Sequence, residues 1–263
     1  MSNKEKLTFW EHLNELRECI IKICIVFVAC SIVAFFFKEE IFAIVLAPRG
    51  ENFVTYRLIE NFNNLIINGT SDFNDVKLIN TGLANQFIIH IKMALQVGFF
   101  LSFPYLLFQL FHFISPALHK NEKKYAISVA IFSCLLFALG FILAYFIIFP
   151  FTYQFLSNYQ VSSDVENLIS LQSYIDNFLA ISLFCSIAFE MPVFAWLLGK
   201  LGIINANVMK EYRRHSIIVI LLIAAIITPT SDVFTLALVS LPLLLLYEIS
   251  IWIVRFCRTD KTS

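Results

Sequence analysis

The sequence predicts an all-α integral membrane protein with six transmembrane helices, arranged as a single membrane domain over residues 1–263. Three observations support this prediction. Hydrophobic residues make up 59% of the 263 positions, 29 of them phenylalanine, and charged residues make up 14%. Soluble domains carry about 45–50% apolar and about 25% charged residues. Long apolar runs recur along the chain, and lysine and arginine gather in alternate loops between them.

Six apolar segments are candidates for membrane crossings. A helix needs about 20 apolar residues to cross the hydrocarbon core of a bilayer. We expect spans at about 19–37, 86–113, 125–150, 172–198, 215–227 and 233–254. The last two are expected to be short, because the fifth ends before Thr228 and Pro229 and the sixth is interrupted by Pro242. A short span implies a thinner bilayer around it or shelter by neighbouring helices.

The basic residues predict the orientation in the membrane. They are concentrated at four places, which are the first span and the segment before it, the loops after the second and fourth spans, and the C-terminus: Lys4, Lys6, Arg17, Lys22, Lys120, Lys123, Lys124, Lys200, Lys210, Arg213, Arg214, Arg255, Arg258 and Lys261. The opposite loops hold four: Lys38, Arg49, Arg57 and Lys77. Because basic residues stay on the cytoplasmic side, both termini are expected to be cytoplasmic.

Composition and cysteine positions argue against several kinds of chemistry. The six cysteines lie within spans or near the basic face, and none lies in an outer loop. No disulfide framework is therefore expected. No metal-ligand spacing occurs, so we expect no metal and no cofactor. We also expect no nucleic-acid partner. The first apolar run begins late and lacks a small-residue cleavage pattern. We therefore expect it to be a membrane span and not a cleaved signal peptide.

Three charged residues occupy positions where charge is unfavourable or unusual. Glu190 lies inside the apolar stretch ISLFCSIAFEMPVFAWLL, two residues before Pro192. Lys92 lies a few residues inside the second span, and Glu122 lies in a loop among lysines. A central Asp or Lys costs about 2.5 to 3.5 kcal/mol on membrane-insertion scales. Glu190 is therefore expected to be neutral, paired or next to water, and a functional role is the default hypothesis for it.

Each of the other charged positions also has a purely structural interpretation. Glu122 could form salt bridges with its neighbouring lysines. Lys92 could extend its ammonium group to the interface. Glu15, on the first helix, could be solvated or paired with Arg17 or Lys22.

Six short motifs occur in order along nearly the whole chain. They are HLNELR (12–17), LAP ending at Pro48, FISPALHKNEKK (113–124), AYFIIFP (144–150), FEMP (189–192) and TPTSDVF (228–234). Together they resemble the TatC subunit of the twin-arginine protein translocase. The resemblance implies six helices bent into a concave cup, and a non-enzymatic receptor subunit of the bacterial cytoplasmic membrane rather than an organelle membrane.

The resemblance also implies partners and an energy source. Members of the family bind signal peptides that carry paired arginines and work with single-span TatA/TatB-type subunits. They move folded proteins across the membrane, driven by the proton-motive force, and self-association in a receptor complex is expected. The lipid bilayer is the remaining partner.

The site residues follow from matching motif positions. Glu15 and Glu122 match the carboxylates that bind the arginine pair, and Arg17 and Phe113 match other positions of that face. The sequence departs from the usual pattern at Cys19, His119 and Lys123–Lys124, and the motif TPTSDVF has an extra residue. The remaining implied positions are an intramembrane partner contact, an outer-loop proline and an outer-loop acid: Glu190, Pro48 and Asp232.

Guanidinium chemistry makes the carboxylate site reasonable. An arginine stays charged and can contact a carboxylate through two parallel hydrogen bonds, whereas the ammonium group of lysine cannot form that fork. Two carboxylates at an interface can therefore distinguish an Arg-Arg pair from a Lys-Lys pair. We also expect nearby lysines to keep Glu122 ionised.

Two other classes of protein were weighed. An ion-coupled solute transporter would have a midplane site built from broken helices in related halves. Pro104, Pro192 and Pro242 allow broken helices, but no paired repeat is visible. Burial of Glu190 in a closed pocket, rather than exposure on a groove, would favour that class. An intramembrane enzyme would need a nucleophile and base or metal ligands, and none of the five histidines forms such a motif.

Overall fold

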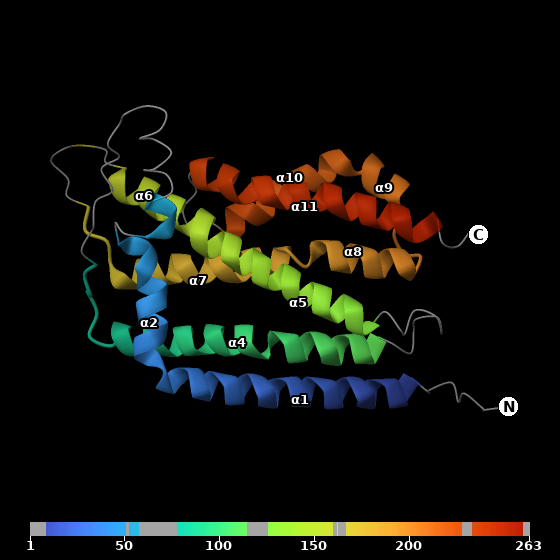
Figure 1. Ribbon diagram of the computed structural model, residues 1–263, viewed down its shortest axis with the longest axis horizontal. Helices are drawn as coiled ribbons and strands as arrows, with labels where there is room; N and C mark the ends of the chain where they lie inside the picture. Colours follow the sequence, from blue (N-terminus) through green and yellow to red (C-terminus); the bar gives the residue numbers. More distant parts are fainter. Residues whose placement is uncertain are drawn as a thin grey trace. The chain divides into compact units, whose positions relative to one another are not determined.

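The computed structural model describes residues 9–50, 53–57, 78–114, 126–159, 162, 167–227 and 233–259. Helices account for nearly all of the regular structure in these ranges, and no strand is formed there beyond one isolated β-bridge (Figure 1). Contacts divide the chain into two compact units. Unit 1 comprises residues 1–37 and 92–135, and unit 2 comprises residues 38–91 and 136–263.

Unit 1 is built on a close pair of helices, α1 (Phe9–Phe36) and α4 (Asn85–Ile114), of which α4 contributes residues from 92 onward. A Cβ placed on Gly98 of α4 would lie 2.6 Å from Cα of Ser31 in α1. The absence of a side chain at Gly98 is what lets the two backbones approach, as small residues do between membrane helices. The start of α5 (Ala126–Leu143) completes this unit.

Unit 2 begins with a short helix and a tight turn. Helix α2 (Lys38–Leu46) is followed by the 3₁₀ turn η1 (Ala47–Arg49). The end of α5 continues into a π-helical turn, η4 (Ala144–Ile148), and then α6 (Phe149–Asn158). Pro150 has no N–H, so the carbonyl of Phe146 four residues earlier has no α-helical donor. The hydroxyl of Thr55 donates a hydrogen bond to that carbonyl instead.

Three tyrosines fasten the α2–η1 segment to the rest of unit 2, and we call them the tyrosine clasp: Tyr56, Tyr145 and Tyr174. The hydroxyl of Tyr145 donates to the carbonyl of Ile44 at 2.7 Å, and that of Tyr174 donates to the carbonyl of Val45 at 2.9 Å. The hydroxyl of Tyr56 lies 3.1 Å from the carbonyl oxygens of Pro48 and Pro150. The carbonyls of Ile44 and Val45, which the end of α2 leaves without helical donors, are satisfied in this way.

The predicted span 172–198 is two helices in the structure. Helix α7 (Leu171–Ala188) begins at the N-cap Ser170, whose hydroxyl accepts a hydrogen bond from the backbone N–H of Ser173 at 3.1 Å. Helix α8 (Met191–Lys200) follows after a break at Phe189 and Glu190. Pro192 stands at the start of α8, where its missing N–H is tolerated. The proline therefore ends one helix and starts the next instead of kinking a single one.

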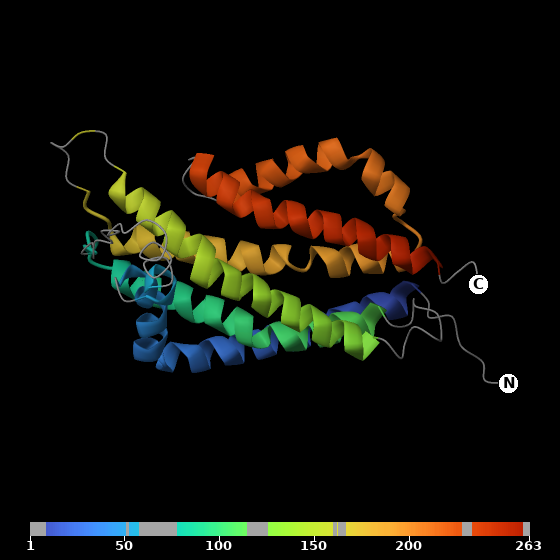
Figure 2. The ribbon, with the colours of Figure 1, turned by 45° about the horizontal axis from the view of Figure 1, so that its top comes forward.

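The last part of unit 2 contains α9 (Ala206–Glu211), α10 (Arg213–Ile227) and α11 (Val233–Thr259). Helix α11 packs along α8, and α9 and α10 meet at a bend beside it (Figure 2). Gly202, with φ of 76°, makes the turn after α8, a conformation that glycine adopts at little cost. Arg213 forms a 2.7 Å ion pair with Glu248, which holds the start of α10 against α11.

Buried Tyr247 of α11 strengthens the same junction. Its hydroxyl donates to the carbonyl of Met209 at 2.7 Å and accepts from the hydroxyl of Ser216 at 2.8 Å. One side chain thus joins α9 and α10 to α11.

Five helical segments of the described residues are long and apolar enough to cross a membrane: 13–36, 85–113, 128–158, 171–200 and 233–256. The fifth predicted span lies within α10, which has 15 residues and is about 22 Å long at about 1.5 Å per residue. The expectation that both final spans are short is wrong for the last one. Helix α11 continues through Pro242 for 27 residues, as membrane helices with proline often do.

Candidate functional site

The N-terminal part of α1 carries two of the predicted site residues. Glu15 and Arg17 are both exposed, and so is Trp10 near the start of the helix. Glu18 and Lys22, which follow on the same helix, form an exposed ion pair of 3.5 Å at i,i+4 spacing. This end of α1 therefore presents charge of both signs to its surroundings.

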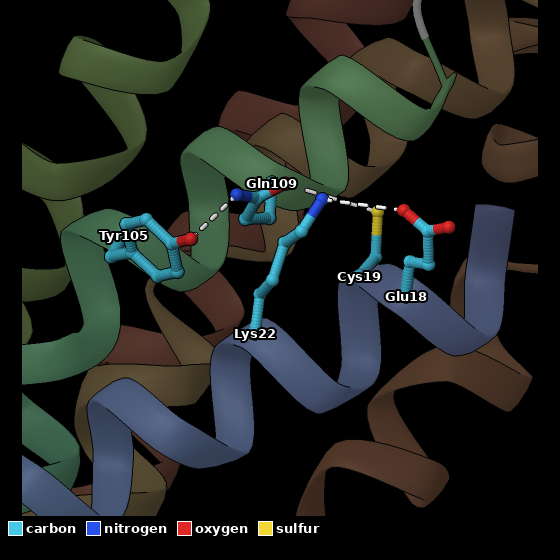
Figure 3. Close-up of polar contacts among 5 residues, drawn as sticks. All are labelled: Glu18, Cys19, Lys22, Tyr105 and Gln109. Carbon is cyan, nitrogen blue, oxygen red and sulfur yellow. Dashed lines mark hydrogen bonds and ion pairs between the residues drawn. The ribbon is translucent and has the colours of Figure 1, made fainter.

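A polar contact joins this part of α1 to α4 (Figure 3). The thiol of Cys19 lies 3.8 Å from Oε1 of Gln109, and it donates a hydrogen bond to that oxygen. Nε2 of Gln109 donates to the hydroxyl of Tyr105 at 2.7 Å. Cys19, Tyr105 and Gln109 are each half-buried, and the sticks in Figure 3 show the three side chains in a row between the helices.

This contact fixes which ends of α1 and α4 lie together. Ser31 approaches Gly98, and Cys19 contacts Gln109, so the two helices run antiparallel. Residues four apart share a helix face. Glu15 precedes Cys19 by four positions and Phe113 follows Gln109 by four. The structure therefore places Glu15 and half-buried Phe113 at the same end of the pair, each one turn beyond the contact.

Two predicted site residues lie outside the described residues. Glu122 belongs to the loop 115–125 and Asp232 to the segment 228–232. Their roles remain predictions from the resemblance. Glu15, Arg17 and Phe113 all belong to unit 1, and their assignment to one recognition face stays a prediction.

Glu190 stands at the break between α7 and α8, where its carbonyl accepts hydrogen bonds from the N–H groups of Val193 and Phe194, both at 3.0 Å. Its side chain is only 3% exposed. Phe178, Ser182 and Ser186 precede Glu190 at steps of four on the same side of α7, and all three are buried. The carboxyl group thus continues a buried face rather than a lipid-facing one.

The α7–α8 break is packed unusually closely against α5. A Cβ on Gly140 would lie 2.9 Å from the carbonyl oxygen of Cys185, the Cα of Ser186 and a ring carbon of Phe189. The chain itself covers Glu190, a feature that by itself favours the solute-transporter class over a receptor with an open groove.

Pro48 is buried within η1 and is held by the tyrosine clasp. Burial raises the pKa of the Tyr56 phenol above its usual value, with a smaller contribution from Tyr153. Tyr56 therefore remains a neutral donor to the carbonyl of Pro48 across the physiological pH range. The role of Pro48 in the family pattern stays a prediction.

The sequence analysis missed Gln109, Tyr105 and the tyrosine clasp. A glutamine inside the apolar stretch SFPYLLFQLFHF is the one local signal that could have indicated Gln109. The tyrosines carried no such signal, because their partners are carbonyls that lie 8 to 129 positions away. Within the described ranges, no cluster of three or more His, Cys, Asp or Glu side chains could hold a metal ion.

The long apolar helices and the buried polar contacts between them define a multi-pass helical membrane protein. The family model for the Sec-independent protein translocase protein (TatC) matches residues 11–242. The chain therefore belongs to the TatC family, which makes it a protein-translocase subunit that takes part in protein transport across a membrane.

Individual relatives agree over almost the full length. The chain is 32% identical over 265 residues to the TatC protein of Blattabacterium sp. subsp. Periplaneta americana, covering 99% of both chains. It is 34% identical over 252 residues to the TatC protein of Aquifex aeolicus, covering 95% of this chain and 96% of that one.

A solved structure supports the fold as well. The crystal structure of the Twin Arginine Translocase Receptor TatC superposes with a TM-score of 0.76 and is 35% identical in sequence. The match covers 94% of this chain and all of that one.

Proposed function

We propose that this chain is the receptor subunit of a twin-arginine translocase in a bacterial cytoplasmic membrane. It binds twin-arginine signal peptides at its cytoplasmic face and recruits single-span TatA/TatB-type subunits, and the proton-motive force drives transport of the folded cargo. The subunit works as one membrane domain that associates with further copies in a receptor complex. Membership of the TatC family and the likeness to a TatC receptor structure support this proposal.

The observation that carries the proposal is the pairing of α1 with α4. Their antiparallel contact through Cys19 and Gln109 places Glu15 and Phe113 at one end of the pair. In the proposed complex, Glu15 and Glu122 receive the two guanidinium groups through forked hydrogen bonds. The ring of Phe113 supplies apolar surface beside them, and Arg17 contributes to the same face.

The topology proposed for the chain has six crossings with both termini in the cytoplasm. Helix α10 provides the fifth crossing. Its length of about 22 Å is less than the roughly 30 Å of hydrocarbon, so the bilayer is expected to thin beside it. The basic residues Arg213 and Arg214 at its start then lie on the cytoplasmic side, in agreement with the distribution of charge.

Glu190 is proposed to contact a TatA-type helix within the membrane, as the family resemblance implies. Because the carboxyl group is buried in this state, the contact requires local opening at the α7–α8 break. Pro48 and Asp232 are proposed to keep structural roles in the outer loops.

Site-specific photo-crosslinking tests the proposed function. A photoreactive amino acid replaces Glu15 or Glu122 in the full-length chain, and membranes are incubated with a signal peptide carrying Arg-Arg or the same peptide carrying Lys-Lys. We expect strong crosslinks with Arg-Arg that fade with Lys-Lys. A crosslinker at exposed Ile226 of α10 is the control and should give none. Equal crosslinking of both peptides, in chains shown to be folded, would contradict the receptor function assigned to this face.

A further inference from the structure

A glutamine half-buried in a membrane helix needs partners for its amide, because hydrocarbon offers none. Gln109 has two. Its Nε2 donates to the hydroxyl of Tyr105 on the same helix, and its Oε1 accepts from the thiol of Cys19 on α1. The amide thus forms the middle of a short chain of hydrogen bonds that crosses from α4 to α1 (Figure 3).

The amide of Gln109 faces two partners. Its Nε2 lies 2.7 Å from the Tyr105 hydroxyl, which accepts, and its Oε1 faces the Cys19 thiol, a weak donor. The tyrosine hydroxyl accepts from Nε2 at i,i+4 spacing, which holds the glutamine side chain in one orientation on its own helix. The bond to Tyr105 therefore orients the Gln109 amide so that its carbonyl oxygen faces α1.

The contact lies directly next to the proposed recognition residues along both helices. Glu15 is one turn from Cys19, and Phe113 is one turn from Gln109. The other close approach of the two helices, at Ser31 and Gly98, is about three turns further along α1. Cys19 and Gln109 thus give the contact between α1 and α4 that lies nearer to Glu15 and Phe113.

We propose that Gln109 is a positioning residue for signal-peptide recognition: its amide, oriented by Tyr105 and joined to Cys19, sets the separation of α1 and α4 beneath Glu15 and Phe113. The functional part of this inference rests on the proposed receptor function. Gln109 acts through the two helices and does not itself contact the arginine pair. Forked contacts to guanidinium groups depend on geometry, so loosening the pair lowers the preference for Arg-Arg over Lys-Lys.

The test uses the full-length chain in lipid nanodiscs and two readouts. The first is the rate at which N-ethylmaleimide alkylates Cys19, measured by mass spectrometry for each variant under the same conditions. The second is the affinity for signal peptides with Arg-Arg and with Lys-Lys. Gln109→Met keeps the length of the side chain but removes both hydrogen bonds. Tyr105→Phe is a milder second variant that removes the partner that orients the amide.

In Gln109→Met we expect Cys19 to be alkylated several times faster than in the wild type. Arg-Arg affinity should fall about two- to tenfold, the effect of one or two hydrogen bonds, and the Arg-Arg to Lys-Lys ratio should fall with it. Tyr105→Phe should give smaller changes in the same directions. Phe108→Leu, an exposed neighbour of Gln109, is the matched control and should change neither readout.

Three results would overturn the inference. Unchanged alkylation in Gln109→Met would show that the amide does not hold the helices together. Faster alkylation with unchanged peptide affinity would show that the separation does not matter for recognition. A loss of affinity for both peptides without faster alkylation would mean that Gln109 contacts the peptide directly. If the wild type itself shows no preference for Arg-Arg, the proposed function fails, and the alkylation rates still decide whether the contact exists.

Discussion

The hydroxyl of Tyr56 donates a hydrogen bond to the carbonyl of Pro48 at 3.1 Å, and both side chains are buried. The same hydroxyl lies 3.1 Å from the carbonyl of Pro150. One hydroxyl donor is therefore shared by two segments that lie about 100 positions apart in the chain. Thr55, the preceding residue, donates to the carbonyl of Phe146 that Pro150 leaves without a helical donor. Thr55 thus compensates for the missing N–H of Pro150, and Tyr56 joins the two proline-containing segments.

Tyr56→Phe is expected to destabilise the protein without changing its shape. The variant keeps the ring but removes the only proton offered by this side chain, so the buried Pro48 carbonyl loses the donor that Tyr56 supplies. An unsatisfied buried acceptor costs about 1–3 kcal/mol, and thermal unfolding in detergent measures the loss. Tyr159→Phe, at an exposed position, is the control. Equal unfolding temperatures for the two variants would mean that the clasp does not stabilise the fold.

Gly140→Ala is expected to destabilise the α5–α7 packing. The new methyl group would meet backbone atoms of Cys185 and Ser186 at 2.9 Å, and backbone cannot move aside as a flexible side chain can. Overpacking of this kind costs about 1–3 kcal/mol. Gly199→Ala is the matched control, since there the methyl group meets a Val254 methyl at 3.3 Å. Both unfolding temperatures are measured together, and a Gly140 variant as stable as the Gly199 variant would refute the close approach.

Glu190→Gln is expected to separate transport from peptide binding. The substitution keeps the volume and polarity of the buried side chain, so the protein should fold and bind the Arg-Arg peptide as the wild type does. Transport of a folded reporter should fall about ten- to a hundredfold, the effect of losing one charge-assisted hydrogen bond to a partner helix. Glu211→Gln, an exposed acid on α9, serves as the control. Wild-type transport in the Glu190 variant would exclude the proposed partner contact.

Several features of the fold could be predicted from local sequence. The apolar runs indicated where helices α1, α4, α5 and α11 would form, because about 20 consecutive apolar residues are the length that a helix needs to cross the bilayer. Pro192 allows a broken helix near Glu190, since proline cannot continue the hydrogen bonds of a helix interior, but the apolar run itself predicts one continuous span there. The length of α11 was underestimated because Pro242 was given the same weight, although a membrane helix can accommodate it.

The candidate site was predicted only in part. The motif containing Glu15 and the motif beginning at Phe113 could each be recognised, but nothing local joins residues that lie about 100 positions apart. The sequence likewise did not decide whether the Glu190 side chain is buried or exposed on a groove. An apolar segment has the same hydrophobic pattern whether it faces lipid or protein.

The sequence by itself determined the class of this protein, the approximate places of its membrane helices and its membership of the TatC family. These properties follow from composition and from residues close together in the chain, where hydropathy and motif spacing act directly. Only the tertiary structure decided that Cys19 meets Gln109, that Tyr56 holds Pro48, and that Glu190 is buried at a helix break. Each of these depends on contacts between residues that are distant in the chain. Local sequence does not distinguish one hydrogen-bonding group from another of the same kind, and packing selects the pair.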